Sequence, residues 1–338
     1  MEAASRVDQG FSIKAPDGKT IAIPAAVDDA SDVYAALTTP DAVKRYYDEQ
    51  GYVVCRNVIP ATLCDDANQA FDLEVKPYPG FIFRQATANP ERHVFTDSGL
   101  MLNSILNLQD LSRRRFPRFR QAGLDAITHA RLRAIVENLL GDRARLVQSM
   151  YFEGNPVTWA HQDTYYLDSA ETGRMVAAWI ALEDISPGAG RFYVYPRSHR
   201  LELLQNRGKY SIAFHHDRYK QHVLDEIRTH GLTCHAPALR RGDVLLWAAR
   251  TIHGSLETTE PQCSRSSFTA HYIPASKAFL QLQSRVVKRL NLETINDIDV
   301  HHPFDQNRLF GRTVLRLASA FPRSFQLAKT VVKKVLTG

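Results

Sequence analysis

The pattern of apolar and polar positions changes character near residue 141. Before it, apolar residues recur at helical spacing and predict helices over 40–50, 61–75 and 117–140. After it, residues 145–275 hold short β-branched and aromatic runs separated by Gly, Pro and Asp, which is typical of strands. Helices followed by many short strands predict an α+β fold with a sandwich or barrel core.

Local signals place several boundaries in the first third of the chain. Thr39 is expected to cap a helix with Pro40 at its first position, and Gly51 to end it. The next run, YVVCRNVI, predicts a strand that Pro60 ends. Further upstream, the PDG turn at 16–18 separates two short strand-like pieces.

These signals divide the chain into three regions. Residues 1–38 are expected to form an N-terminal arm, and residues 39–275 the main domain with its flanking helices. A long excursion at 197–241, with a helical middle at 219–231, has the length of a lid. Residues 276–338 read as a basic, helical C-terminal extension.

The composition disfavours a membrane-spanning or secreted protein but does not select a function. The 338 residues are 44% hydrophobic and 23% charged, with no apolar run long enough for a membrane span and no signal-peptide pattern. Four cysteines without a paired spacing favour free thiols and a cytoplasmic location. The net charge of +6 permits an anionic substrate, a membrane surface or nucleic acid without selecting one. Because no nucleic-acid fold signature accompanies it, we expect a small-molecule substrate and no nucleic acid.

An H-x-D triplet opens the candidate chemistry. His161 and Asp163 lie in the aromatic run TWAHQDTYYL, and on a strand residues i and i+2 point the same way, with Gln162 facing the opposite side. His253 follows the apolar strand DVLLWAART, and Arg265 comes 265 − 253 = 12 positions later at the start of another strand. Two histidines and a carboxylate on one face of a metal are the ligand set of non-haem Fe(II) oxygenases.

A second H-x-D triplet competes with the first. His215-His216-Asp217 also has apparent downstream partners, His301 and, eleven positions later, Arg312. His215 lies beside a helical segment, however, and the sequence after His301 is helical rather than strand-like. The His161 set is therefore preferred on context, and the His215 set is expected at the surface.

At this point the sequence resembles the phytanoyl-CoA dioxygenase-like family over residues 45–275. The motifs that carry the resemblance are WAHQD (159–163), AAWIALED (177–184), GRFYVYPRSH (190–199), GDVLLW (242–247) and HGS (253–255). The family implies a double-stranded β-helix, or jelly-roll, core that carries iron and 2-oxoglutarate.

The resemblance also assigns roles to individual residues. The iron ligands would be His161, Asp163 and His253. Arg265 matches the arginine that binds the distal carboxylate of 2-oxoglutarate, Ser255 a hydroxyl near that carboxylate, and Trp179 a tryptophan beside the cosubstrate. Gln148 and Gln162 are further candidates for cosubstrate contact. Two departures are visible: the stretch from His253 to Arg265 is one residue longer than usual, and Arg197 stands where the family usually has glycine.

The implied reaction consumes 2-oxoglutarate and O2, releases succinate and CO2, and hydroxylates a C–H bond of a small organic or lipid-like substrate. Asp163 argues against a halogenase, because it occupies the place of a bound chloride. Two alternatives use the same residues: a zinc hydrolase, which gives Arg265 and Trp179 no purpose, and a non-enzymatic jelly-roll that binds a ligand. Candidates near the substrate are Phe81, Phe83, Arg84, His93, Tyr165, Tyr166 and Arg174.

The C-terminal segment 323–336 is an amphipathic helix by pattern. Phe325, Ala328, Val331, Val332, Val335 and Leu336 fall on one side of a helical wheel and Arg323, Lys329, Lys333 and Lys334 on the other. We expect the apolar side to pack on the main domain with the lysines in water. The alternative is a helix that lies in a membrane interface.

Overall fold

The protein is described here by a computed structural model that covers residues 11–203, 210–283 and 285–337. Residues 11–38 of the expected N-terminal arm belong to the described part, and its first ten residues lie outside it.

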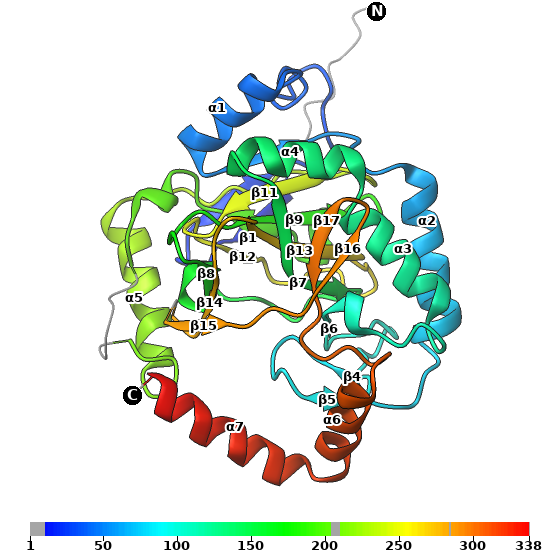
Figure 1. Cartoon of the computed structure of the whole chain (residues 1–338). Helices are drawn as coiled ribbons and strands as arrows, with labels where there is room; N and C mark the ends of the chain where they lie inside the picture. Colours follow the sequence, from blue (N-terminus) through cyan, green and yellow to red (C-terminus); the bar gives the residue numbers. More distant parts are fainter. Residues whose placement is uncertain (1–10, 204–209, 284, 338) are drawn as a thin grey trace, which may run out of the picture.

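Helices and strands alternate irregularly along the chain (Figure 1). The α-helices are α1 (Pro40–Gln50), α2 (Ala61–Ala70), α3 (Pro117–Ile127), α4 (Ala130–Leu140), α5 (His216–Thr229), α6 (Leu309–Ala320) and α7 (Pro322–Thr337). The strands that precede His161 are β1 (Phe11–Lys14), β2 (Thr20–Ile23), β3 (Tyr52–Cys55), β4 (Ile82–Phe83), β5 (Pro90–Glu91), β6 (Ile105–Leu106) and β7 (Ala144–Phe152). Those after it are β8 (Leu167–Ser169), β9 (Val176–Ala181), β10 (Phe192–Val194), β11 (Val244–Ala248), β12 (His253–Ser255), β13 (Ser267–Pro274), β14 (Phe279–Gln281), β15 (Val286–Lys288), β16 (Leu292–Ile295) and β17 (Ile298–His301).

One large mixed sheet organises the molecule. Its strands follow the order β16-β17-β7-β13-β9-β11-β3, with β6 paired to β7 as well. All of these pairs are antiparallel except β17 with β7, which is parallel. Two smaller sheets, β10-β12 and β15-β14-β8, complete the β structure around the site.

The two faces of the large sheet have different neighbours, because side chains alternate along each strand. Phe268, Ala270 and Tyr272 of β13 point outward into a core shared with α2, α3 and α4. On the inner face, Trp179 and Trp247 pack against Phe192 and Val194 of β10 in a second apolar cluster. The chain thus forms two packed layers of β structure with helices outside the larger one, and the space between the layers holds the site.

Several sequence predictions are confirmed. The Thr39 hydroxyl accepts a hydrogen bond from the Ala42 N–H, Pro40 starts α1, and Gly51 ends it in the left-handed conformation. The strands β1 and β2 pair on either side of the PDG turn. The excursion at 197–241 contains α5 as its helical middle.

The single helix predicted over 117–140 is wrong, because it is two helices. Thr128 and His129 separate α3 from α4, and His129 has extended backbone angles (φ −57°, ψ 136°). The Thr128 hydroxyl donates to the carbonyl of Leu124 and accepts from the side chain of Asn296. This side-chain bonding gives the backbone an alternative to the helical pattern at that point.

The helical extension predicted over 276–338 is correct only in part. The helices α6 and α7 lie in this region as predicted, but the strands β14 to β17 precede them. Ile298 and Val300, buried between neighbouring elements, alternate with polar residues over only four positions, which is too short a pattern to separate from a turn.

The predicted packing of the C-terminal helix is also wrong. Lys329 is half-buried and donates to the carbonyls of Thr87 and Ala88, so the part of the polar side that holds Lys329 and Lys333 faces the protein, while Arg323 and Lys334 are exposed. The apolar side, with Val335 at 79% exposed, faces outward. Along the described residues, no helix is both long and apolar enough to cross a membrane.

Candidate metal centre

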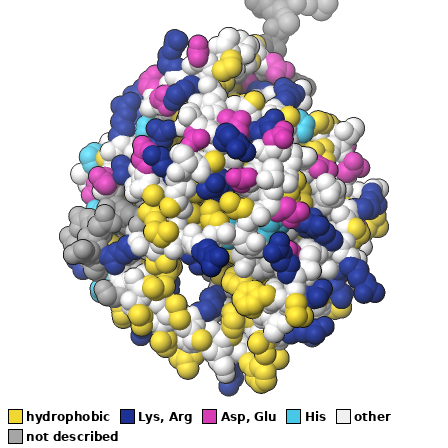
Figure 2. Space-filling view, viewed as in Figure 1, with side chains coloured by type: hydrophobic (Ala, Val, Ile, Leu, Met, Phe, Trp, Pro, Cys, Tyr) yellow, Lys and Arg dark blue, Asp and Glu magenta, His cyan; other side chains and the backbone are white. Residues whose placement is uncertain are grey.

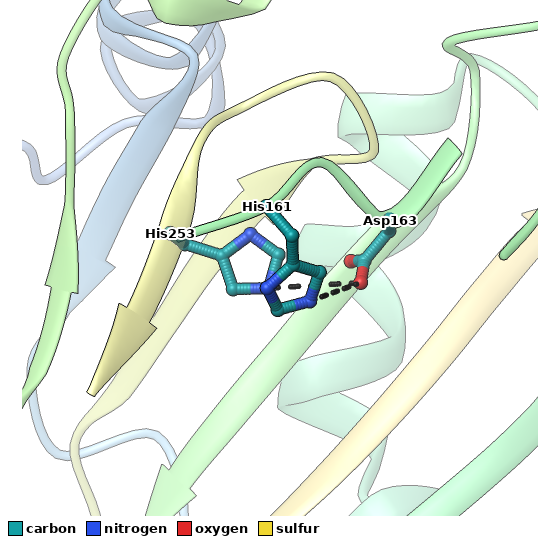
Figure 3. Close-up of side chains that lie close together, drawn as sticks. All are labelled: His161, Asp163 and His253. Atoms are coloured by element: carbon teal, nitrogen blue, oxygen red, sulfur yellow. Dashed lines mark ion pairs between the residues drawn. The ribbon is translucent and has the colours of Figure 1, made fainter. Parts of the chain in front are cut away.

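Three side chains converge between the two β layers. His161 and His253 face each other across an isolated antiparallel bridge, in which each backbone N–H donates to the other's carbonyl. Asp163 stands two residues later, at the start of a short 3-10 turn, Asp163–Tyr165. Its Oδ1 lies 3.6 Å from Nε2 of His161 and 3.6 Å from Nε2 of His253 (Figure 3).

The predicted strand around the H-x-D triplet is therefore wrong in detail, although the convergence that it was meant to explain is present. Only His161 takes part in strand-like pairing, and the chain then turns. The turn brings the carboxylate back toward the histidines, as the ligand atoms of all three residues lie within 4.8 Å of one another. Within the described residues this is the only such His, Cys, Asp and Glu group.

Backbone carbonyls orient both imidazoles. Nδ1 of His161 lies 2.8 Å from the carbonyl of Trp159, and Nδ1 of His253 lies 2.9 Å from that of Thr251. Since a carbonyl can only accept, Nδ1 carries the proton in each ring. Nε2 is left with its lone pair, and both lone pairs are available to a metal.

The two oxygens of Asp163 have separate surroundings. Oδ2 accepts a hydrogen bond of 2.8 Å from Nε1 of Trp247 and lies 3.5 Å from Nε2 of His271. Oδ1 is left facing the two ligand histidines. Burial raises the pKa of Asp163, but the imidazoles of His253, His271 and His161 more than offset this and hold it well below its usual range.

Burial keeps His253 neutral. It lowers the pKa of this imidazole to about 3, against the opposing effect of Asp163. Phe192 stacks on the ring at a centroid distance of 5.4 Å, and Trp247 lies at 4.8 Å. The next residue, Gly254, lets the Tyr193 hydroxyl and the Thr158 carbonyl approach closely, because a Cβ there would collide with both. A neutral histidine in a dry site is ready to bind a cation.

Arg265 supplies a positive charge that forms no ion pair with the carboxylates of the described residues. It is 2% exposed, it lies two residues before β13, and its Nε has no hydrogen-bond partner in the part of the chain that the structure describes. Its Cζ stands 5.4 Å from the ring centroid of Phe152, and burial lowers the pKa of the guanidinium to about 9. A buried, unpaired guanidinium is costly, so this position calls for an anionic ligand.

The donor set fits iron(II). Two imidazole nitrogens and one carboxylate oxygen, all from the protein and all on one side, leave the other side of a metal open. A structural zinc site would use four protein ligands, and the described residues offer three here.

Comparison with known proteins agrees with this geometry. The family model for phytanoyl-CoA dioxygenase matches residues 47–267, which include the three candidate ligands and Arg265. The chain belongs to the phytanoyl-CoA dioxygenase family. Family membership and the donor set together assign iron(II), 2-oxoglutarate and O2 as its cofactor and cosubstrates, and make it an oxygenase.

Individual relatives of this family are distant. Human peroxisomal phytanoyl-CoA dioxygenase is 21% identical over 268 residues, 75% of this chain and 73% of that protein. Among solved structures, the non-haem α-ketoglutarate-dependent carbocyclase SnoK from nogalamycin biosynthesis has a TM-score of 0.53 at 20% identity, covering 74% of this chain and 88% of that one. EctD from S. alaskensis with 2-oxoglutarate and 5-hydroxyectoine has a TM-score of 0.51 at 16% identity, covering 89% and 98%. These structures share the fold.

Trp179, Gln148 and Ser255, which were also predicted to lie near the cosubstrate, belong to different strands around the three candidate ligands. Trp179 and Gln148 lie on β9 and β7, in register with Thr269 and His271 of β13 on the inner face. The Ser255 hydroxyl accepts a hydrogen bond of 2.7 Å from the Thr158 N–H. Their contact with 2-oxoglutarate stays a prediction.

Gln162 is engaged elsewhere. Its side-chain amide donates to the carbonyls of Leu201 and Arg250, which ties the ligand loop to two neighbouring segments. A role at the cosubstrate stays a prediction, and the observed bonds give it a structural one.

The competing triplet is not assembled. Asp217 is 94% exposed at the side chain and pairs with Lys220, and His301 lies on β17 with its Nδ1 near the backbone of Asn291. His216 instead approaches the dioxygenase site, because its Nε2 lies 2.8 Å from the Tyr166 hydroxyl.

Of the residues predicted to lie near the substrate, some lie beside the candidate metal centre and others hold the fold. Tyr166 stands beside His161, with ring centroids 5.7 Å apart. Phe83 belongs to a buried cluster with Met150 and Phe152 of β7. Arg84 instead donates to the backbone of Asn103, and Tyr165 to that of Tyr210, so both hold the fold.

Sequence reasoning missed His271 and the role of Trp247. Trp247 ends the motif GDVLLW, and His271 falls in the strand expected after Arg265, where a period-2 count would have found it. His271 is four residues after Ser267, the first residue of β13, so alternation along the strand places both side chains on the inner face with Thr269.

Proposed function

We propose that this protein is an Fe(II)- and 2-oxoglutarate-dependent hydroxylase that acts on an unactivated C–H bond of a small organic or lipid-like molecule and releases succinate and CO2. The observation that carries the proposal is the pairing of two features in one space. His161, Asp163 and His253 form an open-sided ligand set. Arg265 is buried just before β13, with its Cζ 5.4 Å from the ring centroid of Phe152 and its Nε without a hydrogen-bond partner among the described residues.

The proposed core is a double-stranded β-helix. The large sheet would be one wall, and β8, β10 and β12 would belong to the other. Four free cysteines support the expectation of a cytoplasmic location.

Iron would be held by the three ligands. When bound, it would let O2 act as the oxidant for C–H cleavage, while 2-oxoglutarate would supply two electrons as it is converted to succinate and CO2. Arg265 would bind the distal carboxylate through two parallel hydrogen bonds and so fix the cosubstrate's orientation. Trp247 and Phe192, which pack on the ring of His253, would exclude water from that side of the centre.

The substrate is expected on the side of the centre that the ligands leave open. Tyr166 and His216 form a polar pair there, while Phe83, Met150 and Phe152 form an apolar cluster. An apolar molecule with a polar or anionic handle suits this combination.

Two alternatives remain distinguishable by experiment. A zinc hydrolase would use the same three ligands but has no use for a buried cation such as Arg265. A non-enzymatic binding protein would hold a ligand and form no succinate under any condition.

The test is a panel of candidate substrates scored by succinate release, with iron and 2-oxoglutarate present. Asp163→Ala and His253→Ala should abolish release and weaken iron binding, because each removes one of three protein ligands. Asp217→Ala, which loses an exposed carboxylate from the competing triplet, should retain both. Loss of iron in Asp217→Ala with retention in Asp163→Ala would overturn the assignment.

A further inference from the structure

Helices α6 and α7 carry an unusual set of exposed side chains. Nine large apolar residues between 309 and 336 are more than two-fifths exposed, among them Val335 at 79%, Leu309 at 73% and Phe310 at 70%. We call this set the α6–α7 apolar face: Leu309, Phe310, Leu317, Phe321, Leu327, Val331, Val332, Val335 and Leu336. Monomeric proteins rarely leave a contiguous apolar area of this kind without a partner.

The polar contacts of α7 fix its orientation. The side chain of Gln326 accepts a hydrogen bond of 2.6 Å from Asn89, and Lys329 donates to the backbone carbonyls and the Asn89 side chain of the same β4–β5 turn. At the other end, the carbonyl of Thr337 accepts from Arg285 at 3.0 Å. Residues 326, 329 and 337 share one side of a helix, so the opposite, apolar side is turned away from the protein.

The charge of this region is of one sign. Residues 306–338 contain no Asp or Glu and seven basic residues: Arg308, Arg312, Arg316, Arg323, Lys329, Lys333 and Lys334. Arg312, Arg316, Arg323 and Lys334 are exposed beside the apolar residues. Figure 2 shows hydrophobic side chains along the lower edge of the molecule, over α6 and α7, with Lys and Arg among them, while Asp and Glu gather in the upper half.

We propose that the α6–α7 apolar face docks on the surface of an anionic lipid bilayer. Exposed leucine, valine and phenylalanine would enter the boundary of the acyl chains, and the flanking arginines and Lys334 would contact anionic headgroups. A second copy of the chain fits less well, because pairing two such faces would bring two sets of basic residues together with no acidic residue in either segment.

The docked face lies next to the site. Val314 and Leu315, on the other side of α6, pack with Phe304 against the buried cluster that contains Met150 and Phe152 of the inner sheet face. Resting on the proposed function, this places the open side of the centre near the bilayer and favours an amphiphilic, lipid-derived substrate. The docking itself does not depend on catalysis.

The experiment is co-sedimentation of the full-length protein with vesicles of phosphatidylcholine alone or mixed with phosphatidylglycerol, without iron or substrate. A charge variant changes Arg312, Arg316 and Arg323 to Gln, and an apolar variant changes Leu327, Val331 and Val335 to Gln. The control changes Arg45, Arg131 and Arg143 to Gln, which removes the same charge from exposed positions on α1, on α4 and before β7. Thermal melting of each variant checks its fold.

We expect the protein to pellet with the anionic vesicles only, and added salt to release it. Each basic residue near an anionic surface contributes roughly fivefold, so the charge variant should bind about 100-fold more weakly. The apolar variant should also fail to pellet, and the control should bind as the parent does.

Supernatant protein under every condition would overturn the proposal, as would equal losses in the control and charge variants. A dimer in solution that the apolar variant dissociates would assign the face to a second copy instead. None of these outcomes requires succinate formation, so failure here is separable from failure of the proposed reaction.

Discussion

Oδ1 of Asp163 faces the two candidate ligand histidines, while Oδ2 contacts other side chains. Trp247 and His271 contact Oδ2, so the carboxylate cannot rotate without losing a hydrogen bond in a buried site. Partners of this kind orient a ligand and commonly change metal affinity when removed. Trp247 and His271 are therefore positioning residues.

Trp247→Phe should weaken iron(II) binding by roughly 10- to 100-fold, because it removes the donor to Oδ2 and keeps an aromatic ring in place. His271→Asn should have a smaller effect, since its contact with Oδ2 is 3.5 Å. The measurement is metal titration of the purified protein. Tyr272→Phe is the control: it removes a buried hydrogen bond to the carbonyl of Ile127 on the outer face, so it should lower stability and leave iron affinity unchanged. Equal iron affinities in Trp247→Phe and the parent would contradict this role.

Arg265→Ala should raise the KM for 2-oxoglutarate by at least about 30-fold, from a loss of roughly 2–5 kcal/mol when a buried carboxylate loses its partner. Lysine should restore only part of it, because an ammonium cannot form the planar pair of hydrogen bonds. Arg241→Ala, an exposed arginine paired with Asp65, is the matched control and should leave the KM unchanged. An unchanged KM in Arg265→Ala would remove the cosubstrate assignment and favour the zinc alternative.

At the scale of elements, helix ends were predicted correctly where the residues at the end themselves determine the backbone conformation. Thr39, Pro40 and Gly51 set the ends of α1 through their own backbone and side-chain chemistry. The convergence of His161, Asp163 and His253 was predicted from the sequence, although only His253 lies in a strand; the cosubstrate role of Arg265 stays a prediction. The division of α3 from α4, the turn at Asp163 and the strands β14 to β17 were not predictable. Each depends on partners distant in sequence, such as Asn296 for Thr128 and Trp247 for Asp163.

Arg197, which stands where the family usually has glycine, has a backbone conformation that favours glycine. This residue adopts a left-handed conformation (φ 67°, ψ −2°), the region that glycine occupies without a steric penalty. Its N–H donates to the carbonyl of Gln50 at 2.7 Å, which holds the loop in this geometry. Its guanidinium pairs with Glu49, but both side chains are more than half exposed.

Arg197→Gly should therefore raise the free energy of unfolding by about 0.5–1 kcal/mol in urea denaturation. Removing the left-handed penalty contributes about 1 kcal/mol or more, the greater freedom of glycine in the unfolded chain offsets part of it, and the exposed ion pair contributes little. Arg197→Ala loses the same ion pair and keeps the backbone penalty, so it should give no gain. A glycine variant less stable than the alanine variant would show that the backbone is not strained there.

At the scale of the whole molecule, distant parts of the chain share one sheet. The strand β3, at one edge, pairs with β11, whose first residue comes 244 − 55 = 189 positions after the last of β3. Near the other edge, β7 pairs with β17, which begins 298 − 152 = 146 positions after β7 ends. The C-terminal region thus contributes to the main sheet as well as to the surface, which composition alone did not indicate.

This strand order has a consequence for synthesis on the ribosome. At about 5–20 residues per second, β3 would wait roughly 10–40 s for β11 to be translated. All four β3 residues are apolar or aromatic and buried in the finished protein, so the nascent chain exposes them throughout that interval. We expect ribosome-bound chains arrested before residue 244 to be digested rapidly by protease and to bind chaperones, and resistance to appear only after β11 and β13 have emerged. Protease resistance in chains arrested before residue 244 would contradict this order of events. Soluble yield of the protein should accordingly depend on chaperone supply during translation more than on the stability of the finished fold.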